Sequence, residues 1–206
     1  MTLGCTRSAL VLELAGVTRL HGGRPVWAPL DLSVAAGTLS VVTGVNGSGK
    51  STLLRLAAGL LRPSAGTRWC DGRALYVRGG GGLRSAQTVA AAVATTATLA
   101  GRREAAPAAL ALLRMHGFAD RRVGTLSAGE RVRVALAAAW AADPALLCLD
   151  EPTAVLDEAG VRDLVEILGC LRENGCATLV ATHQPADLLP AADAHLLLVG
   201  GRVTSG

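Results

Sequence analysis

The segment GVNGSGKST, from Gly44 to Thr52, contains the only lysine of the chain. Arginine supplies the other 19 of the 20 Lys and Arg side chains, so lysine occurs at one position only. Closely spaced glycines let a backbone wrap around an anion and point its amide groups at it. An ammonium group is a compact charge on a flexible stem, whereas a planar guanidinium would fit such a loop badly. We therefore interpret the segment as a phosphate-binding loop in which Lys50 reaches the β- and γ-phosphates of a nucleotide.

The spacing of the loop matches the pattern G-x-x-x-x-G-K-[ST], with a predicted strand before it and a predicted helix after it. The predicted nucleotide-binding residues are Gly44, Val45, Asn46, Gly47, Ser48, Gly49, Lys50, Ser51 and Thr52. The Ser51 hydroxyl is expected to bind Mg²⁺ as well. The alternative is a glycine-rich turn between strand and helix that carries an incidental lysine.

A second set of polar residues ends the apolar run Ala145–Asp150. A strand that delivers a carboxylate at its carboxyl end is typical of proteins that hold the Mg²⁺ of a bound nucleotide. Asp150 is the predicted metal-binding carboxylate. Glu151, next to it, is the predicted general base that would polarise a water molecule for attack on the γ-phosphate. The alternative is a pair of carboxylates that cap a turn before Pro152.

Composition narrows the class of protein. The chain has 206 residues, half of them hydrophobic and 17% charged, which predicts one folded domain rather than disorder. The net charge is +4, but basic residues occur only in ones and twos and aromatic residues are few, so we expect no nucleic-acid partner. Five cysteines without a C-x-x-C pair favour a reducing cytoplasm. The longest uncharged stretch, 85–101, is too short and too weakly apolar to cross a membrane.

Short apolar runs alternate with helical periodicity along the chain. Predicted strands cover 10–14, 30–34, 38–43, 67–70, 74–77, 145–150, 177–182 and 195–199, the last followed by a polar tail. Predicted helices cover 51–61, 127–142 and 159–172, and residues 88–116 are helix-forming with interruptions near 101 and 107. This alternation predicts an α/β fold with a parallel sheet and a helical insert over about 85–142, within a single domain of residues 1–206.

The segment LSAGE, Leu126–Glu130, has two interpretations. Ser127 and Glu130 have the spacing of a capping box at the start of a helix. A glycine at a helix N-terminus also suits an anion. With this segment the chain resembles the ATP-binding cassettes of ABC transporters over nearly its whole length. The resemblance rests on the phosphate loop, on LSAGE as the family's signature, and on LDEP, AVLD and THQ, which follow in the family's order at 149–152, 154–157 and 182–184.

The resemblance implies a P-loop NTPase fold with a RecA-like parallel core, an N-terminal antiparallel β part and a short helical subdomain. It implies two cassettes that bind ATP and Mg²⁺ between them, head to tail, with Ser127 and Gly129 of one on the γ-phosphate held by the other. His183 would be the switch histidine that positions the γ-phosphate and the attacking water, unless it is a satisfied buried histidine. His21 would stack on adenine, unless it is an exposed turn histidine.

The chain departs from the family most clearly in one loop; Glu130 in place of the usual Gln and Ala154 in place of the usual Ser are milder changes. The family has a glutamine between the β-rich part and the helical insert, which contacts Mg²⁺ and senses the membrane subunit. Here RGGGG stands near Gly80, and Gln87 comes several residues later. Either the glycines let Gln87 reach the site or the contact is missing.

The predicted function is a cytoplasmic ATPase subunit, peripheral on the inner face of the cell membrane through a separate permease. Its second cassette would be another copy of itself or a paralogue. Within the family the chain resembles most the ATP-binding subunit of bacterial haem exporters used in cytochrome c maturation. The alternatives are the cassette of a different ABC exporter and a non-transport cassette, or one that hydrolyses ATP weakly. A P-loop kinase would lack LSAGE and THQ in register.

Overall fold

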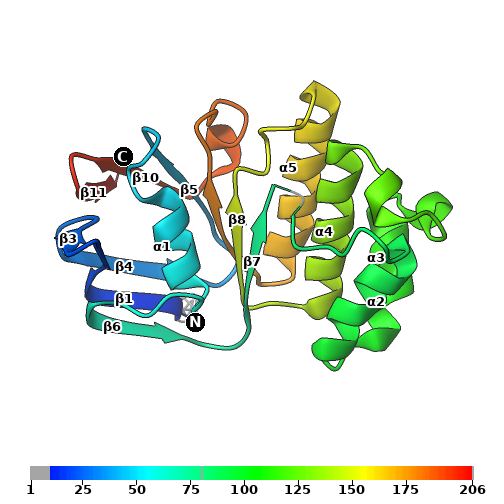
Figure 1. Ribbon diagram of the computed structural model, residues 1–206, viewed down its shortest axis with the longest axis horizontal. Coiled ribbons are helices and arrows are strands. Elements are labelled where there is room, and N and C mark those ends of the chain that lie inside the picture. Colours follow the sequence, from blue (N-terminus) through cyan, green and yellow to red (C-terminus); the bar gives the residue numbers. More distant parts are fainter. Residues whose placement is uncertain (1–9, 80, 206) are drawn as a thin grey trace, which may run out of the picture.

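A six-stranded sheet forms the centre of the computed structural model, in the order β11-β10-β5-β9-β8-β7 (Figure 1). The structure describes residues 10–79 and 81–205. The strands of this sheet are β5 (Leu39–Gly44), β7 (Ala74–Arg78), β8 (Leu146–Asp150), β9 (Ala177–Ala181), β10 (Ala194–Val199) and β11 (Arg202–Ser205). Neighbours from β10 to β7 are parallel, and β11 adds an antiparallel edge. The predicted parallel sheet is confirmed.

The central strands form because their sequences are short runs of mostly apolar and β-branched residues. Every residue of β8 and β9 is buried, as expected for parallel strands that are covered on both faces. The carboxyl ends of β5, β8 and β9 lie at one edge of this sheet, where the following loops carry the polar motifs of the sequence.

A second, antiparallel sheet lies at the amino-terminal side, in the order β4-β1-β6. Its strands are β1 (Leu10–Thr18), β4 (Leu30–Ala35) and β6 (Ala65–Cys70), and a short hairpin joins β2 (Leu20–His21) to β3 (Arg24–Pro25). Helix α1 (Lys50–Ala57) lies between the two sheets in Figure 1 and shares one apolar core with both. This arrangement confirms the predicted antiparallel β part.

The remaining helices lie on the other side of the main sheet (Figure 1). They are α2 (Val89–Leu99), α3 (Ala106–Leu112), α4 (Ala128–Ala142) and α5 (Glu158–Glu173), with short 3₁₀ turns at 103–105, 116–118, 123–125 and 189–191. Helix α4 packs against α2, α3 and α5, largely through alanine side chains. In the described part of the chain, no helix has the length and apolar content needed to cross a bilayer.

Three sequence expectations were wrong in detail. The tail after β10 is the strand β11 rather than a polar extension, because Gly200 and Gly201 adopt positive φ and turn the chain back. Helix α1 ends at Ala57 instead of residue 61, since Gly59 takes the left-handed conformation that terminates helices before Pro63 is reached. Pro107 lies in the first turn of α3, where proline is tolerated, so it begins that helix instead of interrupting it.

Leu54 of α1 is fully buried in the core between the two sheets. Leu54→Ala is expected to lower the free energy of unfolding by about 2–5 kcal/mol, because a buried cavity replaces the lost methyl groups. Leu60, six residues later, is 62% exposed, and Leu60→Ala should change stability by about 0.5 kcal/mol or less. Chemical denaturation of both variants measures the contrast, and equal midpoints would contradict the burial of Leu54 in this core.

Candidate functional site

The glycine loop connects the end of β5 to α1. Gly44 has φ +149° and Gly49, which caps α1, has φ +102°, conformations that favour glycine. A Cβ atom on Gly44 would lie 2.5 Å from the carbonyl oxygen of Leu198, and one on Gly49 would lie 2.6 Å from Cγ1 of Val26. The backbone of the loop can therefore take this shape only with glycine at both positions, which fits a loop that approaches a ligand closely.

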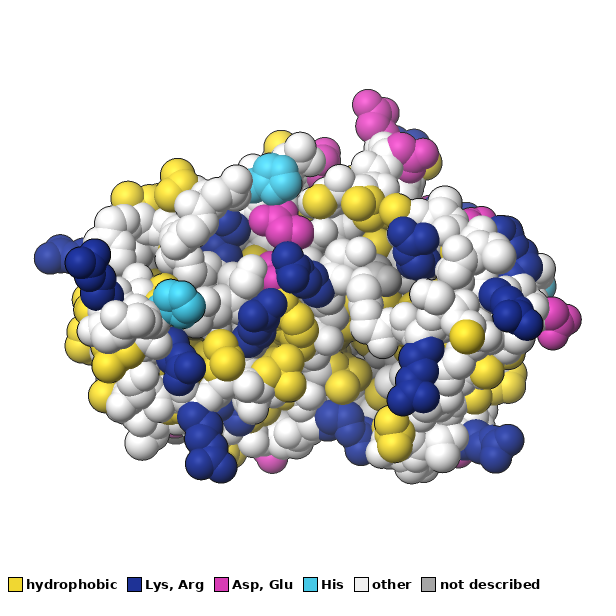
Figure 2. Space-filling view, in the orientation of Figure 1, with side chains coloured by type: hydrophobic (Ala, Val, Ile, Leu, Met, Phe, Trp, Pro, Cys, Tyr) yellow, Lys and Arg dark blue, Asp and Glu magenta, His cyan; other side chains and the backbone are white. Residues whose placement is uncertain are grey.

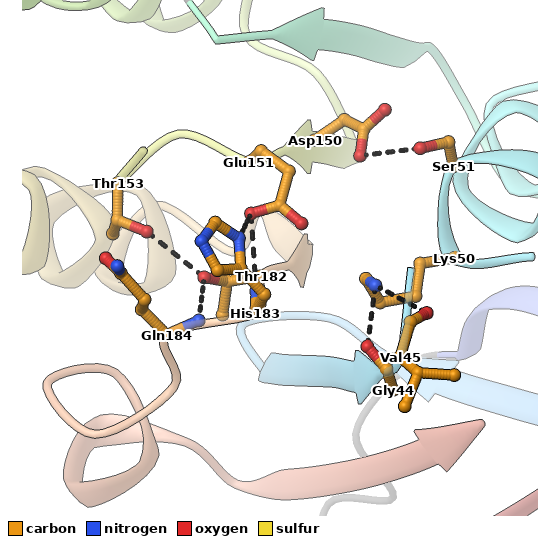
Figure 3. A network of polar contacts seen from close by, with 10 residues as sticks. All are labelled: Gly44, Val45, Lys50, Ser51, Asp150, Glu151, Thr153, Thr182, His183 and Gln184. Carbon is orange, nitrogen blue, oxygen red and sulfur yellow. Dashed lines mark hydrogen bonds and ion pairs between the residues drawn. The ribbon is translucent and has the colours of Figure 1, made fainter. Parts of the chain in front are cut away.

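Lys50 begins α1 and is 6% exposed. Its Nζ donates to the carbonyl oxygens of Gly44, at 2.7 Å, and Val45, at 3.3 Å, so the ammonium group lies under the loop (Figure 3). The hydroxyl of Ser48 is buried and has no hydrogen-bond partner in the described part of the protein. A buried cation, an unpaired hydroxyl and a helix N-terminus at one loop are a suitable environment for a phosphate group.

Asp150 is the last residue of β8, and its side chain contacts Ser51 at the end of the glycine loop. Its Oδ1 accepts from the Ser51 hydroxyl at 3.0 Å, as Figure 3 shows, and its Oδ2 accepts from the Tyr76 hydroxyl at 2.6 Å. Asp150 is 1% exposed. Oxygen atoms of a carboxylate and a hydroxyl are the ligands that Mg²⁺ prefers, so the predicted pair has the right chemistry for this metal.

Glu151 and His183 come together from the ends of β8 and β9 (Figure 3). Oε2 of Glu151 accepts from Nδ1 of His183 at 2.7 Å and from its backbone amide at 3.3 Å. The backbone of Glu151 has φ +53°, a conformation that few non-glycine residues adopt, and its amide donates to the carbonyl of Ala181 at 2.8 Å. Such backbone strain is concentrated at functional sites, where the surrounding structure enforces it.

The loop and Glu151 share one cavity of about 590 Å³, within the usual range of small-molecule sites. The lining residues of this main cavity are Arg19, Leu20, His21, Val26, Asn46, Gly47, Gly49, Lys50, Ser51, Thr52, Arg55, Leu61 and Glu151. The side chains on the face drawn in Figure 2 include several basic groups near the acidic ones at the middle of the molecule. Six of the nine predicted loop residues and His21 therefore line the same cavity as the predicted general base, whereas Gly44, Val45 and Ser48 do not line it.

Ser127 and Gly129 lie elsewhere. They line a separate cavity of about 300 Å³ beside Leu156, Asp157 and Gly160. The predicted capping box is present, because Ser127 Oγ accepts from the amide of Glu130 at 3.2 Å and the amide of Ser127 donates to Glu130 Oε2 at 2.6 Å. A single chain therefore does not bring the signature segment to the cavity that contains Lys50.

Gln87 does not line the main cavity. Its Nε2 donates to the hydroxyl of Thr95 on α2 at 3.2 Å, and residue 80 of the glycine run lies outside the described residues. Gly79 lies beside the backbone of Asp150, because its amide donates to the Asp150 carbonyl at 3.0 Å. Of the two alternatives for this loop, the structure agrees with a missing glutamine contact.

This placement predicts that Gln87→Ala leaves the steady-state ATPase rate within about twofold of the unmodified protein, since the side chain touches no group of the main cavity. Phosphate release at saturating Mg-ATP measures it. A tenfold loss of rate would show that Gln87 reaches the site during turnover.

Sequence reasoning missed Tyr76, Arg19 and Arg55. Arg55 follows Ser51 by one helical turn, so the i, i+4 spacing placed it on the same side of α1 and could have found it. Tyr76, the only tyrosine of the chain, gave no such signal, because its contact with Asp150 joins two strands that are far apart in the sequence.

A parallel sheet with a glycine loop at its edge and two carboxylates across from that loop defines a P-loop NTPase. A model of the ABC transporter family matches residues 28–154, more than half of the chain. The chain belongs to the ABC transporter family and is an ATPase of the ATP-binding cassette type.

The chain is 35% identical to the phosphonates import ATP-binding protein PhnC 1 of Natronomonas pharaonis, over 94% of this chain and 91% of that protein. It is 38% identical to the cytochrome c biogenesis ATP-binding export protein CcmA of Roseobacter denitrificans, over 89% of this chain and 87% of that protein. Among solved structures, cbiO1 from Clostridium perfringens, part of the ABC transporter complex cbiONQ, superposes with a TM-score of 0.84 at 26% identity, over 96% and 88% of the two chains.

Proposed function

We propose that this cassette ATPase powers a separate membrane permease that exports haem for cytochrome c maturation. The ATPase chemistry is supported by one observation: Lys50, Ser51 and Glu151 line one cavity, and Asp150 accepts a hydrogen bond from Ser51. The whole of residues 1–206 would form one ATP-binding domain, with 85–142 inserted as the helical subdomain. It would lie on the cytoplasmic face of the membrane, held there by the permease.

In this proposal the loop Gly44–Thr52 holds the phosphates of ATP. The Lys50 ammonium group would turn from the loop carbonyls to the β- and γ-phosphates, which accept a charge-assisted hydrogen bond more strongly. Ser51 and Asp150 would hold Mg²⁺, which supplies positive charge that neutralises the phosphate oxygens. His21, which lines the same cavity, would stack on the adenine ring.

Glu151 would act as the general base. Both hydrogen bonds from His183 reach Oε2, which leaves Oε1 to accept the proton of a water molecule as its oxygen attacks the γ-phosphorus. The bond from the γ-phosphorus to the bridging oxygen breaks, and ADP and phosphate result. His183 would hold the carboxylate in position and contact the γ-phosphate through its exposed ring.

The signature segment would act on a second cassette. Ser127 and Gly129 line a different cavity from Lys50, so they would not contact the nucleotide bound by their own chain. They would contact the γ-phosphate held by another copy or a paralogue. These contacts exist only when the two cassettes close, so ATP would favour closure and hydrolysis would reopen the pair. Light scattering of Glu151→Gln with and without Mg-ATP tests this step: a nucleotide-dependent dimer is expected, and a monomer even when a paralogous cassette is added would refute it.

The proposed cargo is supported by several relatives that are named as cytochrome c biogenesis export proteins. Other relatives of similar identity are named for import of phosphonates or zinc, so the cargo requires its own test. A strain whose only copy of this gene encodes Lys50→Ala should lose covalently bound haem in its c-type cytochromes. Normal c-type cytochromes in that strain would reject haem export and leave a different cargo for the same ATPase.

A weakly hydrolysing cassette is the second candidate, because Gln87 lies away from the site and Gly79, which has no side chain, lies beside the backbone of Asp150. The steady-state ATPase rate of the chain purified together with its permease distinguishes a transport ATPase from a weakly hydrolysing cassette. A rate in the range of ordinary enzymes, about 1 s⁻¹ or higher with the permease, supports a transport ATPase, and a rate far below that supports the second candidate.

A further inference from the structure

Asp150 is a buried carboxylate whose partners are hydroxyl groups. The residue is 1% exposed, and in the described ranges no lysine, arginine or histidine forms an ion pair with it. Ser51 donates to Oδ1 and Tyr76 donates to Oδ2. A buried carboxylate needs such donors, because an unpaired charge in the interior is strongly unfavourable. The two donors also fix which oxygen of Asp150 faces Ser51, a residue that lines the main cavity.

Tyr76 reaches Asp150 from the neighbouring strand. It pairs with Cys148 in the β7–β8 register, and Asp150 comes two residues later on the same face of β8. Its hydroxyl also accepts from Nε of Arg55 at 3.3 Å, and Cζ of Arg55 lies 5.7 Å from the centre of its ring. A phenol is protonated at physiological pH and a carboxylate is not, so Tyr76 is the donor of this hydrogen bond.

We propose that Tyr76 is the positioning residue of the metal site: its hydroxyl holds Oδ2 of Asp150 so that Oδ1 points at Ser51, and Arg55 holds the phenol in turn. The proposal rests on the proposed binding of Mg²⁺ by Ser51 and Asp150. Figure 3 shows the geometry it explains, with one oxygen of Asp150 directed at Ser51 and the other directed away.

The role follows from what each donor does when the metal binds. The Ser51 oxygen would bind the metal through a lone pair, while its proton stays available to Oδ1. The bond from Tyr76 would be the side-chain bond to Asp150 that comes from outside the set of metal ligands, and it would restrain the rotation of the carboxylate, a torsion with broad energy minima. Without it the carboxylate would sample other orientations and Oδ2 would lack a buried partner. Groups that orient a metal ligand typically contribute about 10- to 100-fold to metal affinity.

Tyr76→Phe tests the proposal, because it removes the hydroxyl and keeps the ring. Calorimetry would give the affinity for the β,γ-imido analogue of ATP in excess EDTA and in excess Mg²⁺. We expect the affinity without metal to stay within about twofold, and the gain in affinity produced by Mg²⁺ to fall about tenfold or more. A gain equal to that of the unmodified protein, or an equal loss in EDTA and in Mg²⁺, would overturn the proposal.

Thr178→Val is the matched control. Thr178 is 2% exposed at the opposite end of the same sheet, so its variant also deletes a buried hydroxyl, but far from Asp150. It should lower thermal stability and leave the Mg²⁺-dependent gain unchanged. If this control loses the gain as Tyr76→Phe does, the effect comes from general destabilisation and the proposal fails.

Two further measurements keep the test decisive if Tyr76→Phe does not fold. Arg55→Gln should reduce the Mg²⁺-dependent gain in the same direction by a smaller factor, since Arg55 acts through the phenol. In the unmodified protein, Tyr76 is the only tyrosine, so ¹³C labelling at its ζ carbon gives one NMR signal. That signal should shift when Mg²⁺ is added to the analogue complex, and no shift would overturn the proposal.

Measurements on the unmodified protein distinguish a failure of this proposal from a failure of the proposed Mg²⁺ site. If Mg²⁺ gives it no gain in affinity, the assignment of the metal to Ser51 and Asp150 fails. If it shows the gain and Tyr76→Phe retains all of it, only the role of Tyr76 fails.

Discussion

Glu151→Gln is expected to lower the rate of ATP hydrolysis by about 100- to 1000-fold while the affinity for ATP stays within a few fold. The amide keeps the size of the side chain and can still accept a hydrogen bond from His183, but it cannot take the proton of the attacking water. The unusual backbone conformation of Glu151 and its bond to His183 hold the carboxylate at the main cavity, ready for this role. Phosphate release and calorimetric binding to the same preparation measure the two quantities.

Glu158→Gln is the control for that result. Its side chain is 97% exposed and makes only a long surface ion pair with Arg162, so both rate and affinity should be unchanged. If Glu151→Gln keeps more than about a third of the rate, Glu151 is not the general base and another group must accept the proton.

Lys50→Ala is expected to weaken ATP binding by about 100-fold or more, equivalent to about 2.7 kcal/mol, because charge-assisted bonds to the phosphates are lost. Lys50→Arg should also weaken binding by about tenfold or more. The ammonium group lies under the loop, bonded to the carbonyls of Gly44 and Val45, where a larger planar guanidinium does not fit. Calorimetry with ATP in excess EDTA measures both variants without hydrolysis.

Arg162→Ala is the matched loss of positive charge, at a side chain that is 71% exposed on α5 and away from the main cavity. It should leave ATP binding unchanged. If Lys50→Arg binds ATP as well as the unmodified protein, the position needs only a positive charge, and the shape of the ammonium group does not explain the single lysine.

The elements and most of the site could be predicted because their signals are local. The strands β5, β8 and β9 are runs of mostly apolar and β-branched residues, and each is followed at once by its polar motif. Parallel pairing then brings these carboxyl ends to one edge, so Lys50 and Glu151, about a hundred residues apart, line one cavity.

The rest depended on contacts that have no local signal. The bond between Tyr76 and Asp150 joins different strands, and the bond of Gln87 to Thr95 depends on how the glycine run turns. The predicted end of α1 at residue 61 is wrong because Gly59, in the left-handed conformation, terminates the helix earlier. For Ser127 the sequence predicted a helix cap or an anion site, and the structure contains the cap; the contact with a phosphate held by a second cassette remains a proposal.

The most direct test of the central claim is to purify the tagged chain from native membranes and identify the proteins present in near-equal amount. We expect a polytopic membrane permease to co-purify and to raise the ATPase rate, and we expect the catalytically inactive Glu151→Gln variant to recover the same permease. A permease of the haem-exporter kind would support the proposed cargo. Recovery of the chain only from the soluble fraction, alone or with ribosomes, would contradict the claim that this ATPase powers a membrane permease.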